Sequence, residues 1–192
     1  MPEALTGTSD DKAMADCLRA ALLGVEQTAL ANGASIDGLA RLSGGANMET
    51  WSFDWVRTTE IEPLILRRVP GQTLDFENAV GELTLKDEAA LIDIAGRYGV
   101  PVPVVRLVLR PEHALGQGYI MSRERGEALP FRLLADDCYR DARERLAFQC
   151  GQTLGRIHKI PLESLPEGLS DHSGVLLFQH AQELLDTQGN LS

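Results

Sequence analysis

The order of strand-like and helix-like segments constrains the fold of this chain more than any single motif does. Five segments have strand periodicity or strand composition, and one helical segment separates the third from the fourth. The strands are predicted at residues 36–42, 51–55, 61–69, 104–109 and 118–124, and the helix at residues 83–98. Because consecutive strands with short connections pair in antiparallel fashion, we expect an α+β fold in which a helix packs against a five-stranded antiparallel sheet.

Only helical patterns follow Pro130. Helices are predicted at residues 136–159 and 174–186, and the first carries an apolar stripe formed by Leu146, Cys150, Leu154 and Ile157. We therefore expect three parts along the chain. They are an N-terminal tail and helix that Gly33 ends (residues 1–33), a sheet lobe (residues 34–126) and the start of a helical lobe (residues 127–192).

Charge and cysteine usage limit the partners. The 192 residues carry a formal net charge of -10 without a cluster of Lys and Arg, which argues against nucleic acid as a partner. No apolar run approaches the roughly 20 residues that span a bilayer, so no membrane partner is expected. The three cysteines lack C-x-x-C spacing and the N-terminus does not resemble a signal peptide. We expect a soluble, cytoplasmic protein.

Side-chain alternation assigns faces to the second predicted strand. Trp51, Phe53 and Trp55 fall on one face, whereas Ser52 and Asp54 fall on the other. A period of two between large apolar and polar residues is typical of a strand that buries one face. The sheet is therefore expected to bury its aromatic face.

Two neighbouring arginines interrupt the apolar strand L-I-L-R-R-V. Arg67 and Arg68 point to opposite faces, so at most one of them shares a face with a bound ligand. A buried cation needs a partner, although both side chains can instead extend to water at a sheet edge. Glu88, which the helical spacing places on one face with Leu91 and Ala95, offers such a partner to Arg67. Alternatively, Glu88 is a first-turn residue that the helix dipole favours.

Two segments have the composition of ligand-binding backbone. A glycine-rich turn between the first two strands lets several N–H groups approach a phosphate, although the same residues suit any tight hairpin. Neither G-x-x-x-x-G-K-[ST] nor G-x-G-x-x-G occurs. The last strand, Y-I-M-S-R-E, runs into the lobe boundary, where Met121 either lines an adenine site or is ordinary core. The glycine-rich turn between the first two strands consists of Ser43, Gly44, Gly45, Ala46 and Asn47.

Six motifs occur in a fixed order over residues 37–160: L-S-G-G-A-N-M-E-T-W, P-L-I-L-R-R-V-P, K-D-E-A-A-L, G-V-P-V-P-V-V, G-Y-I-M-S-R-E-R-G and L-G-R-I-H-K-I. Together they resemble the aminoglycoside phosphotransferase family, and more narrowly the branch related to the kinase-like domain of certain acyl-CoA dehydrogenases. The resemblance implies a protein-kinase-like fold, with a small nucleotide-binding lobe, a linker and a helical lobe. It also implies ATP-dependent transfer of a phosphoryl group to a hydroxyl of a small metabolite.

The resemblance implies roles for the candidate residues. Ser43 to Asn47 would form the loop over the phosphates, Arg67 would stand where the family usually has a strand lysine, and Glu88 would be its helix partner. An arginine contacts phosphate differently from a lysine, because its guanidinium is a planar fork rather than a point charge. The linker that meets adenine would contain Met121, Ser122 and Glu124.

One expected element is missing from the sequence. The family's catalytic loop, H-G-D-x-x-x-x-N, and the later metal-binding Asp do not occur, so no catalytic residue is assigned and magnesium would need residues that this chain lacks. The chain alone is predicted to be inactive. Three interpretations follow: a truncated kinase that continues beyond Ser192 and self-associates through exposed C-terminal helices, a non-catalytic nucleotide- or partner-binding module, or a structural domain. We favour the first; the acceptor stays open.

Overall fold

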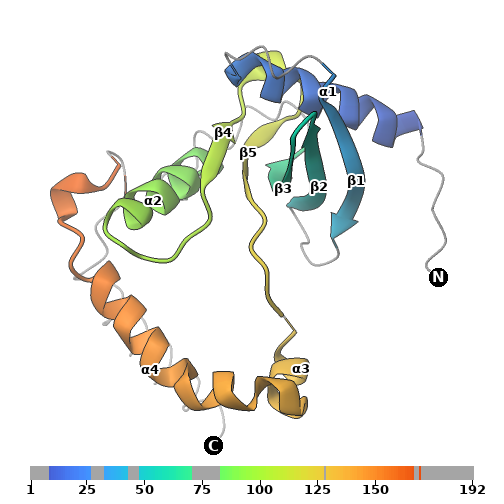
Figure 1. The fold of residues 1–192 in the computed structure, drawn as a ribbon. Coiled ribbons are helices and arrows are strands. Elements are labelled where there is room, and N and C mark those ends of the chain that lie inside the picture. Colours follow the sequence, from blue (N-terminus) through green and yellow to red (C-terminus); the bar gives the residue numbers. More distant parts are fainter. Residues whose placement is uncertain are drawn as a thin grey trace, which may run out of the picture.

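The structure of the chain is a computed structural model. It describes residues 9–26, 33–42, 48–70, 83–127, 129–166 and 169. Five strands form one sheet in the order β1-β2-β3-β5-β4, and all neighbouring strands are antiparallel. The strands are β1 (Ser35–Leu42), β2 (Glu49–Arg57), β3 (Glu60–Val69), β4 (Val105–Val108) and β5 (Gln117–Ser122). The expected α+β fold with a five-stranded antiparallel sheet followed by helices is confirmed (Figure 1).

Four α-helices and three short 3-10 helices complete the described chain. The α-helices are α1 (Ser9–Val25), α2 (Leu85–Arg97), α3 (Pro130–Ala135) and α4 (Arg140–Ile157), and the 3-10 helices are η3 (Pro111–His113), η4 (Asp137–Tyr139) and η5 (Leu162–Ser164). The helix predicted at residues 174–186 lies outside the described residues. No helix among the residues described is long and apolar enough to cross a membrane.

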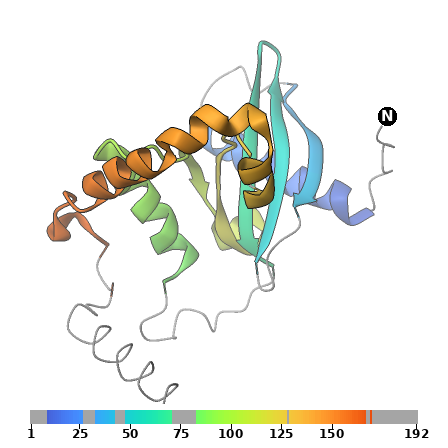
Figure 2. The same ribbon diagram turned by 90° about the horizontal axis from the view of Figure 1, so that it is seen from below.

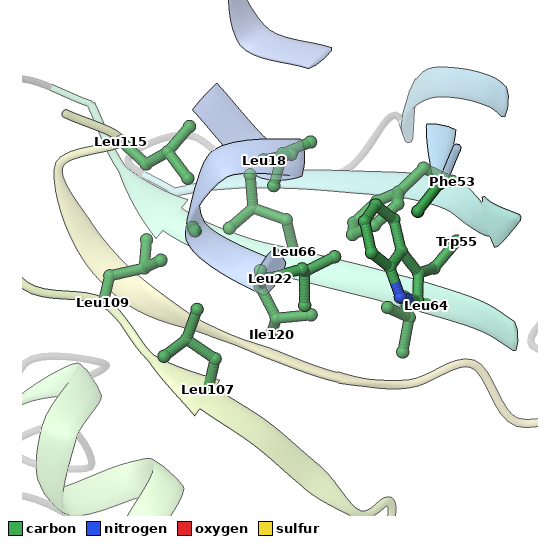
Figure 3. Packing of buried hydrophobic residues seen from close by; sticks show 12 residues of the cluster. Leu18, Leu22, Phe53, Trp55, Leu64, Leu66, Leu107, Leu109, Leu115 and Ile120 are labelled. Carbon is green, nitrogen blue, oxygen red and sulfur yellow. The ribbon is translucent and has the colours of Figure 1, made fainter. Parts of the chain in front are cut away.

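The larger core lies between α1 and one face of the sheet, which we call the α1 face. Leu18 and Leu22 of α1 pack onto a layer of strand residues (Figure 3). Its most buried large side chains include Phe53, Trp55, Leu64, Leu66 and Ile120. The alternation in β2 therefore directs its aromatic residues inward, as predicted. Burying a side chain of this size stabilises the fold by about 1.5–3 kcal/mol, so this layer supplies a large share of the stability.

The opposite face of the sheet, which we call the α2 face, is covered only in part. Helix α2 packs mainly over β4 and β5, where Leu85 and Ala89 contact the buried ring of Tyr119. Thr50 and Ser52 of β2 also point to this face and stay partly exposed. Figure 2 shows α1 and α2 on opposite sides of the sheet. The sheet thus has a helix on each face, with α1 packed on one of them. The division of the chain at residues 33 and 126 stays a prediction.

The start of α2 follows from a local capping arrangement. The Thr84 hydroxyl accepts a hydrogen bond from the Asp87 amide at 3.1 Å, and the Asp87 carboxylate accepts one from the Thr84 amide at 3.3 Å. Such a reciprocal pair satisfies amides that have no partner within the helix. The cap fixes the first turn of α2, and Glu88, which occupies the next position, is fixed with it.

The buried stripe of α2 differs from the predicted one. The sequence placed Glu88 on a buried face with Leu91 and Ala95, but three other residues are buried: Leu85, Ala89 and Ile94. Leu85 and Ala89, four residues apart, form the side that packs on Tyr119, whereas Ile94 lies on another side of the helix, so the docking of α2 on β5 and not the spacing alone decides which residues are buried. Glu88 consequently lies at the edge of the buried stripe, with its side chain 30% exposed.

Two predicted helix boundaries are wrong. Helix α1 ends at Val25, well before Gly33. The long helix predicted from residue 136 begins only at Arg140, because Asp136 has an extended backbone and its side chain accepts a hydrogen bond from the Cys138 amide at 3.1 Å. A side chain that bonds nearby backbone in this way competes with helix formation. The short helices α3 and η4 therefore precede α4.

The helical segment returns toward α2 after leaving the sheet (Figure 1). Arg156 of α4 donates a hydrogen bond to the Gly99 carbonyl at 3.2 Å, and the Tyr98 and Ser164 hydroxyls lie 2.9 Å apart. The predicted stripe of α4 remains exposed, for example at Leu154, which is 51% exposed. Self-association through these helices stays a prediction.

Candidate nucleotide site

The predicted phosphate loop, residues 43–47, lies outside the described residues. Its two ends are described: β1 ends at Leu42 and β2 begins at Glu49, and Leu42 pairs with Thr50. Thr50 in turn pairs with Arg67 of β3. The connection between β1 and β2 therefore leaves and re-enters the sheet beside the strand position of Arg67.

Strand register places two rows of side chains on the α2 face. Residues directly opposite one another in antiparallel strands share a face, as do residues two positions apart on one strand. The first row is polar and runs across β2, β3 and β5, and the second lies two residues along each strand and combines one polar with two apolar side chains. The first row consists of Thr50, Arg67 and Tyr119, and the second row consists of Ser52, Ile65 and Met121.

Arg67 and Glu88 come together across the strand and helix. The Arg67 Nε lies 3.1 Å from Glu88 Oε1 and 3.3 Å from Oε2, and about a third of each side chain is exposed. Within the described part of the chain, neither terminal nitrogen of Arg67 has a hydrogen-bond partner, and its ion pair with Glu88 is closest at Nε. The guanidinium is therefore held by one edge, and its other donors remain available to a ligand.

Arg68 has a different environment on the α1 face. Its Nε and Nη2 donate to Glu49 Oε2 at 3.0 and 2.8 Å, and its Nη1 donates to the Leu115 carbonyl at 3.2 Å. All three nitrogens of Arg68 are thus engaged within the protein. The two arginines point to opposite faces, and Arg67 is the one whose terminal N–H groups remain available to a ligand.

Tyr119 is a site residue that the sequence reasoning missed. Its hydroxyl donates a hydrogen bond to Glu88 Oε1 at 2.9 Å, and the residue is 1% exposed. Burial, followed by the hydrogen bond to Glu88, raises the pKa of Tyr119 above its usual range, so the hydroxyl keeps its proton and donates. The available signal was the period of two that puts Tyr119 on the same face as Met121.

The predicted linker begins with a set of local hydrogen bonds. The Ser122 hydroxyl accepts from the Val104 amide at 2.9 Å and donates to Glu124 Oε1 at 2.8 Å. Arg123 forms an ion pair with Asp54 at 2.6 Å. Met121 lies on the α2 face, whereas Ser122 and Glu124 bond to each other and fix the direction in which the chain leaves β5.

A separate pocket of about 750 Å³ lies at the turn between β4 and β5. It is lined by the start of α2, including Thr84 and Lys86, and by the turn, including Pro111 and Gly116. Arg67, Glu88 and Met121 do not line it. The candidate site is therefore the exposed part of the α2 face and not this pocket.

Glu49, the partner of Arg68, gives the lobe a pH dependence. Burial alone would raise the pKa of Glu49, but hydrogen bonds from Trp51 and Arg68 and the charges of Arg68 and Arg41 outweigh it, and the pKa is below its usual value of 4.5. A lowered carboxyl pKa stabilises the fold above the unfolded-state value and ceases to do so as pH falls through the folded-state value.

We expect Glu49→Gln to be less stable than the unmodified chain at pH 7, and we expect this difference to shrink as the pH falls below about 4.5. Urea unfolding between pH 3 and pH 7 measures the difference in the free energy of unfolding. Glu112→Gln is the control, because Glu112 is 63% exposed and its contact to Arg110 is 3.8 Å. A difference that stays constant with pH would contradict this account.

The residues described include no group of three His, Cys, Asp or Glu side chains that could hold a metal ion. Their arrangement therefore does not fit a magnesium site built from these residues alone. Binding of a nucleotide phosphate, by contrast, suits the available donors of Arg67.

A sheet lobe with a strand cation paired to a helix carboxylate, followed by helices, is the arrangement of a kinase-like nucleotide-binding lobe. A family model described as the phosphotransferase enzyme family matches residues 39–188. The chain belongs to this family. No curated protein and no solved structure matches the chain. The narrower relation to acyl-CoA dehydrogenase-linked kinases stays a prediction.

Proposed function

We propose that the sheet lobe, residues 34–126 together with α1, binds ATP as the nucleotide-binding part of a small-molecule phosphotransferase. The observation that carries the proposal is the state of Arg67. Glu88 contacts its Nε, and among the described residues its terminal nitrogens have no hydrogen-bond partner, on a face that α1 does not cover. Membership of the phosphotransferase family, whose enzymes generally use ATP, supports the same conclusion.

The two rows on the α2 face suit the two ends of a nucleotide. Arg67 would contact phosphate oxygens, because two parallel N–H donors match the geometry of an anionic oxygen pair. Ile65, which is 8% exposed, and the partly exposed Met121 are the apolar members of the neighbouring row and would lie against the base. Met121 is also the last of these residues before the linker, where Ser122 and Glu124 would bring backbone groups to the adenine edge.

Ser43–Asn47 would lie over the phosphates from the end of the sheet where Arg67 is located. Glycines in this loop permit close approach of backbone N–H groups to phosphate. In phosphoryl transfer the protein contributes chiefly positioning and charge stabilisation, and a nucleotide-binding lobe supplies both to the transferring phosphate. The acceptor would be a hydroxyl of a small metabolite.

A thermal unfolding experiment tests the proposal. We expect ATP to raise the midpoint of unfolding of the full 192-residue chain, because a ligand that binds only the folded state stabilises it. Adenosine should raise the midpoint less, since it lacks the phosphates that Arg67 would bind. Glu88→Ala should reduce the ATP effect while the smaller adenosine effect persists. Equal midpoints with and without ATP, at millimolar ATP, would refute nucleotide binding.

A further inference from the structure

Glu88 is held from two directions by residues of two strands. The Tyr119 hydroxyl of β5 donates to Glu88 Oε1 at 2.9 Å, and the Arg67 Nε of β3 lies 3.1 Å from the same oxygen. Tyr119 and Arg67 are directly opposite each other in the β3–β5 register. The three side chains therefore form one connected unit that joins β3, β5 and α2.

The position of the Tyr119 ring is fixed by its surroundings. The residue is 1% exposed and packs against Leu85 and Ala89 of α2. The preceding residue, Gly118, lies so close to β3 that a Cβ there would collide with the Arg67 carbonyl oxygen and would lie 2.8 Å from the Arg68 Cα. The close pairing of β5 with β3 and the packing of the ring on α2 together place the hydroxyl beside Glu88.

An arginine can bind a carboxylate in two ways that differ in what they leave free. An end-on, bidentate contact uses both terminal nitrogens, whereas a side-on contact uses Nε and leaves a terminal nitrogen exposed. Arg67 makes its contacts to Glu88 through Nε. The Tyr119 hydrogen bond holds the carboxylate at the edge of α2, where Nε reaches it.

We propose that Tyr119 is a positioning residue for nucleotide phosphate: its hydroxyl fixes the Glu88 carboxylate, and Glu88 in turn holds Arg67 by Nε with its terminal nitrogens directed at the phosphates. This inference rests on the proposed function of the site. It assigns a role in affinity for the triphosphate to a buried residue that does not itself touch the nucleotide. The role belongs to the hydroxyl and not to the ring.

The substitution Tyr119→Phe separates these two roles, because it keeps the buried ring and removes the hydroxyl. We expect the affinity for ATP to fall about tenfold, as for the loss of about 1.4 kcal/mol of binding free energy, while the affinity for adenosine stays unchanged. Isothermal titration of the full chain with each ligand measures both. A residue with a merely structural role would lower the two affinities together or neither.

Two further variants sharpen the test. Tyr98→Phe is the matched control, because it removes a hydroxyl that bonds Ser164 away from the site and should leave ATP affinity unchanged. In a Glu88→Gln background, Tyr119→Phe should have little additional effect on ATP affinity, since the tyrosine acts through Glu88. An equal tenfold loss in both backgrounds would overturn the proposal.

A second measurement does not depend on nucleotide. The Arg67 Nε–H resonance, assigned by its loss in Arg67→Lys, should exchange slowly with water in the unmodified chain and several-fold faster in Tyr119→Phe. Unchanged exchange would overturn the positioning role even if ATP binds. If the chain binds no ATP, the proposed function fails, and the exchange comparison still decides whether Tyr119 positions Arg67.

Discussion

Arg67→Met is expected to lower the affinity of the chain for ATP about 100-fold. A hydrogen bond between charged groups contributes about 1.5–3 kcal/mol, and loss of about 2.7 kcal/mol corresponds to this factor. Methionine keeps much of the apolar stem of arginine and removes the donors. Affinity for adenosine should change little, because the base would contact Ile65 and Met121 instead. Isothermal titration with ATP and adenosine gives both values.

Arg68→Met is the matched control for this experiment. Arg68 is the next residue on the same strand, but it faces α1 and uses all three nitrogens on Glu49 and Leu115. We expect Arg68→Met to lower the free energy of unfolding and to leave the ratio of ATP to adenosine affinity intact. A larger loss of ATP affinity in Arg68→Met than in Arg67→Met would place the phosphate contact on the α1 face and contradict the proposed site.

Arg57→Met is expected to cause the largest loss of stability among the substitutions considered. Its Nη1 lies 2.7 Å from Glu26 Oε1, and its Nη2 lies 3.1 Å from Glu62 Oε2. The side chains of Arg57 and Glu26 are 15% and 12% exposed. Removing the arginine leaves Glu26 with a neutral donor, the Trp55 indole at 3.0 Å, and without its cation. Breaking a buried pair in this way costs about 3 kcal/mol or more.

The double variant Arg57→Met/Glu26→Gln should recover part of that loss, because it removes the unpaired charge as well. The pair is not fully satisfied, since Glu26 Oε2 and Arg57 Nε are buried without a partner among the described residues. Urea unfolding measures all variants, and Arg97→Met, whose ion pair with Asp93 is highly exposed, should change stability by less than about 0.5 kcal/mol. A double variant less stable than Arg57→Met would contradict this explanation.

The strands could be predicted because their sequence signals are local. The alternation of Trp51, Phe53 and Trp55 with polar residues identified both a strand and its buried face, and the adjacency of Arg67 and Arg68 placed them on opposite faces. These conclusions need only the period of two that any strand has. The sheet and the choice of Arg67 as a candidate followed from such signals.

The features that the sequence did not predict depend on how distant segments dock. Which stripe of α2 is buried depends on its rotation against β5, and helical spacing alone permits several stripes. The Tyr119 hydrogen bond to Glu88 depends on the same rotation. The contact of Glu26 with Arg57 joins residues far apart in the sequence and has no local pattern. Residues 43–47, the predicted phosphate loop, stay a prediction because they lie outside the described residues.

One measurement tests the central claim most directly: methyl resonances followed by NMR as ATP is added to the full chain. Ile65 and Met121 carry methyl groups on the α2 face, and Leu66 and Ile120, their neighbours in sequence, carry methyl groups on the α1 face. If the lobe binds nucleotide as proposed, the Ile65 and Met121 resonances shift with ATP concentration and those of Leu66 and Ile120 shift far less. Shifts confined to Leu66 and Ile120, or no shifts at millimolar ATP, would contradict it.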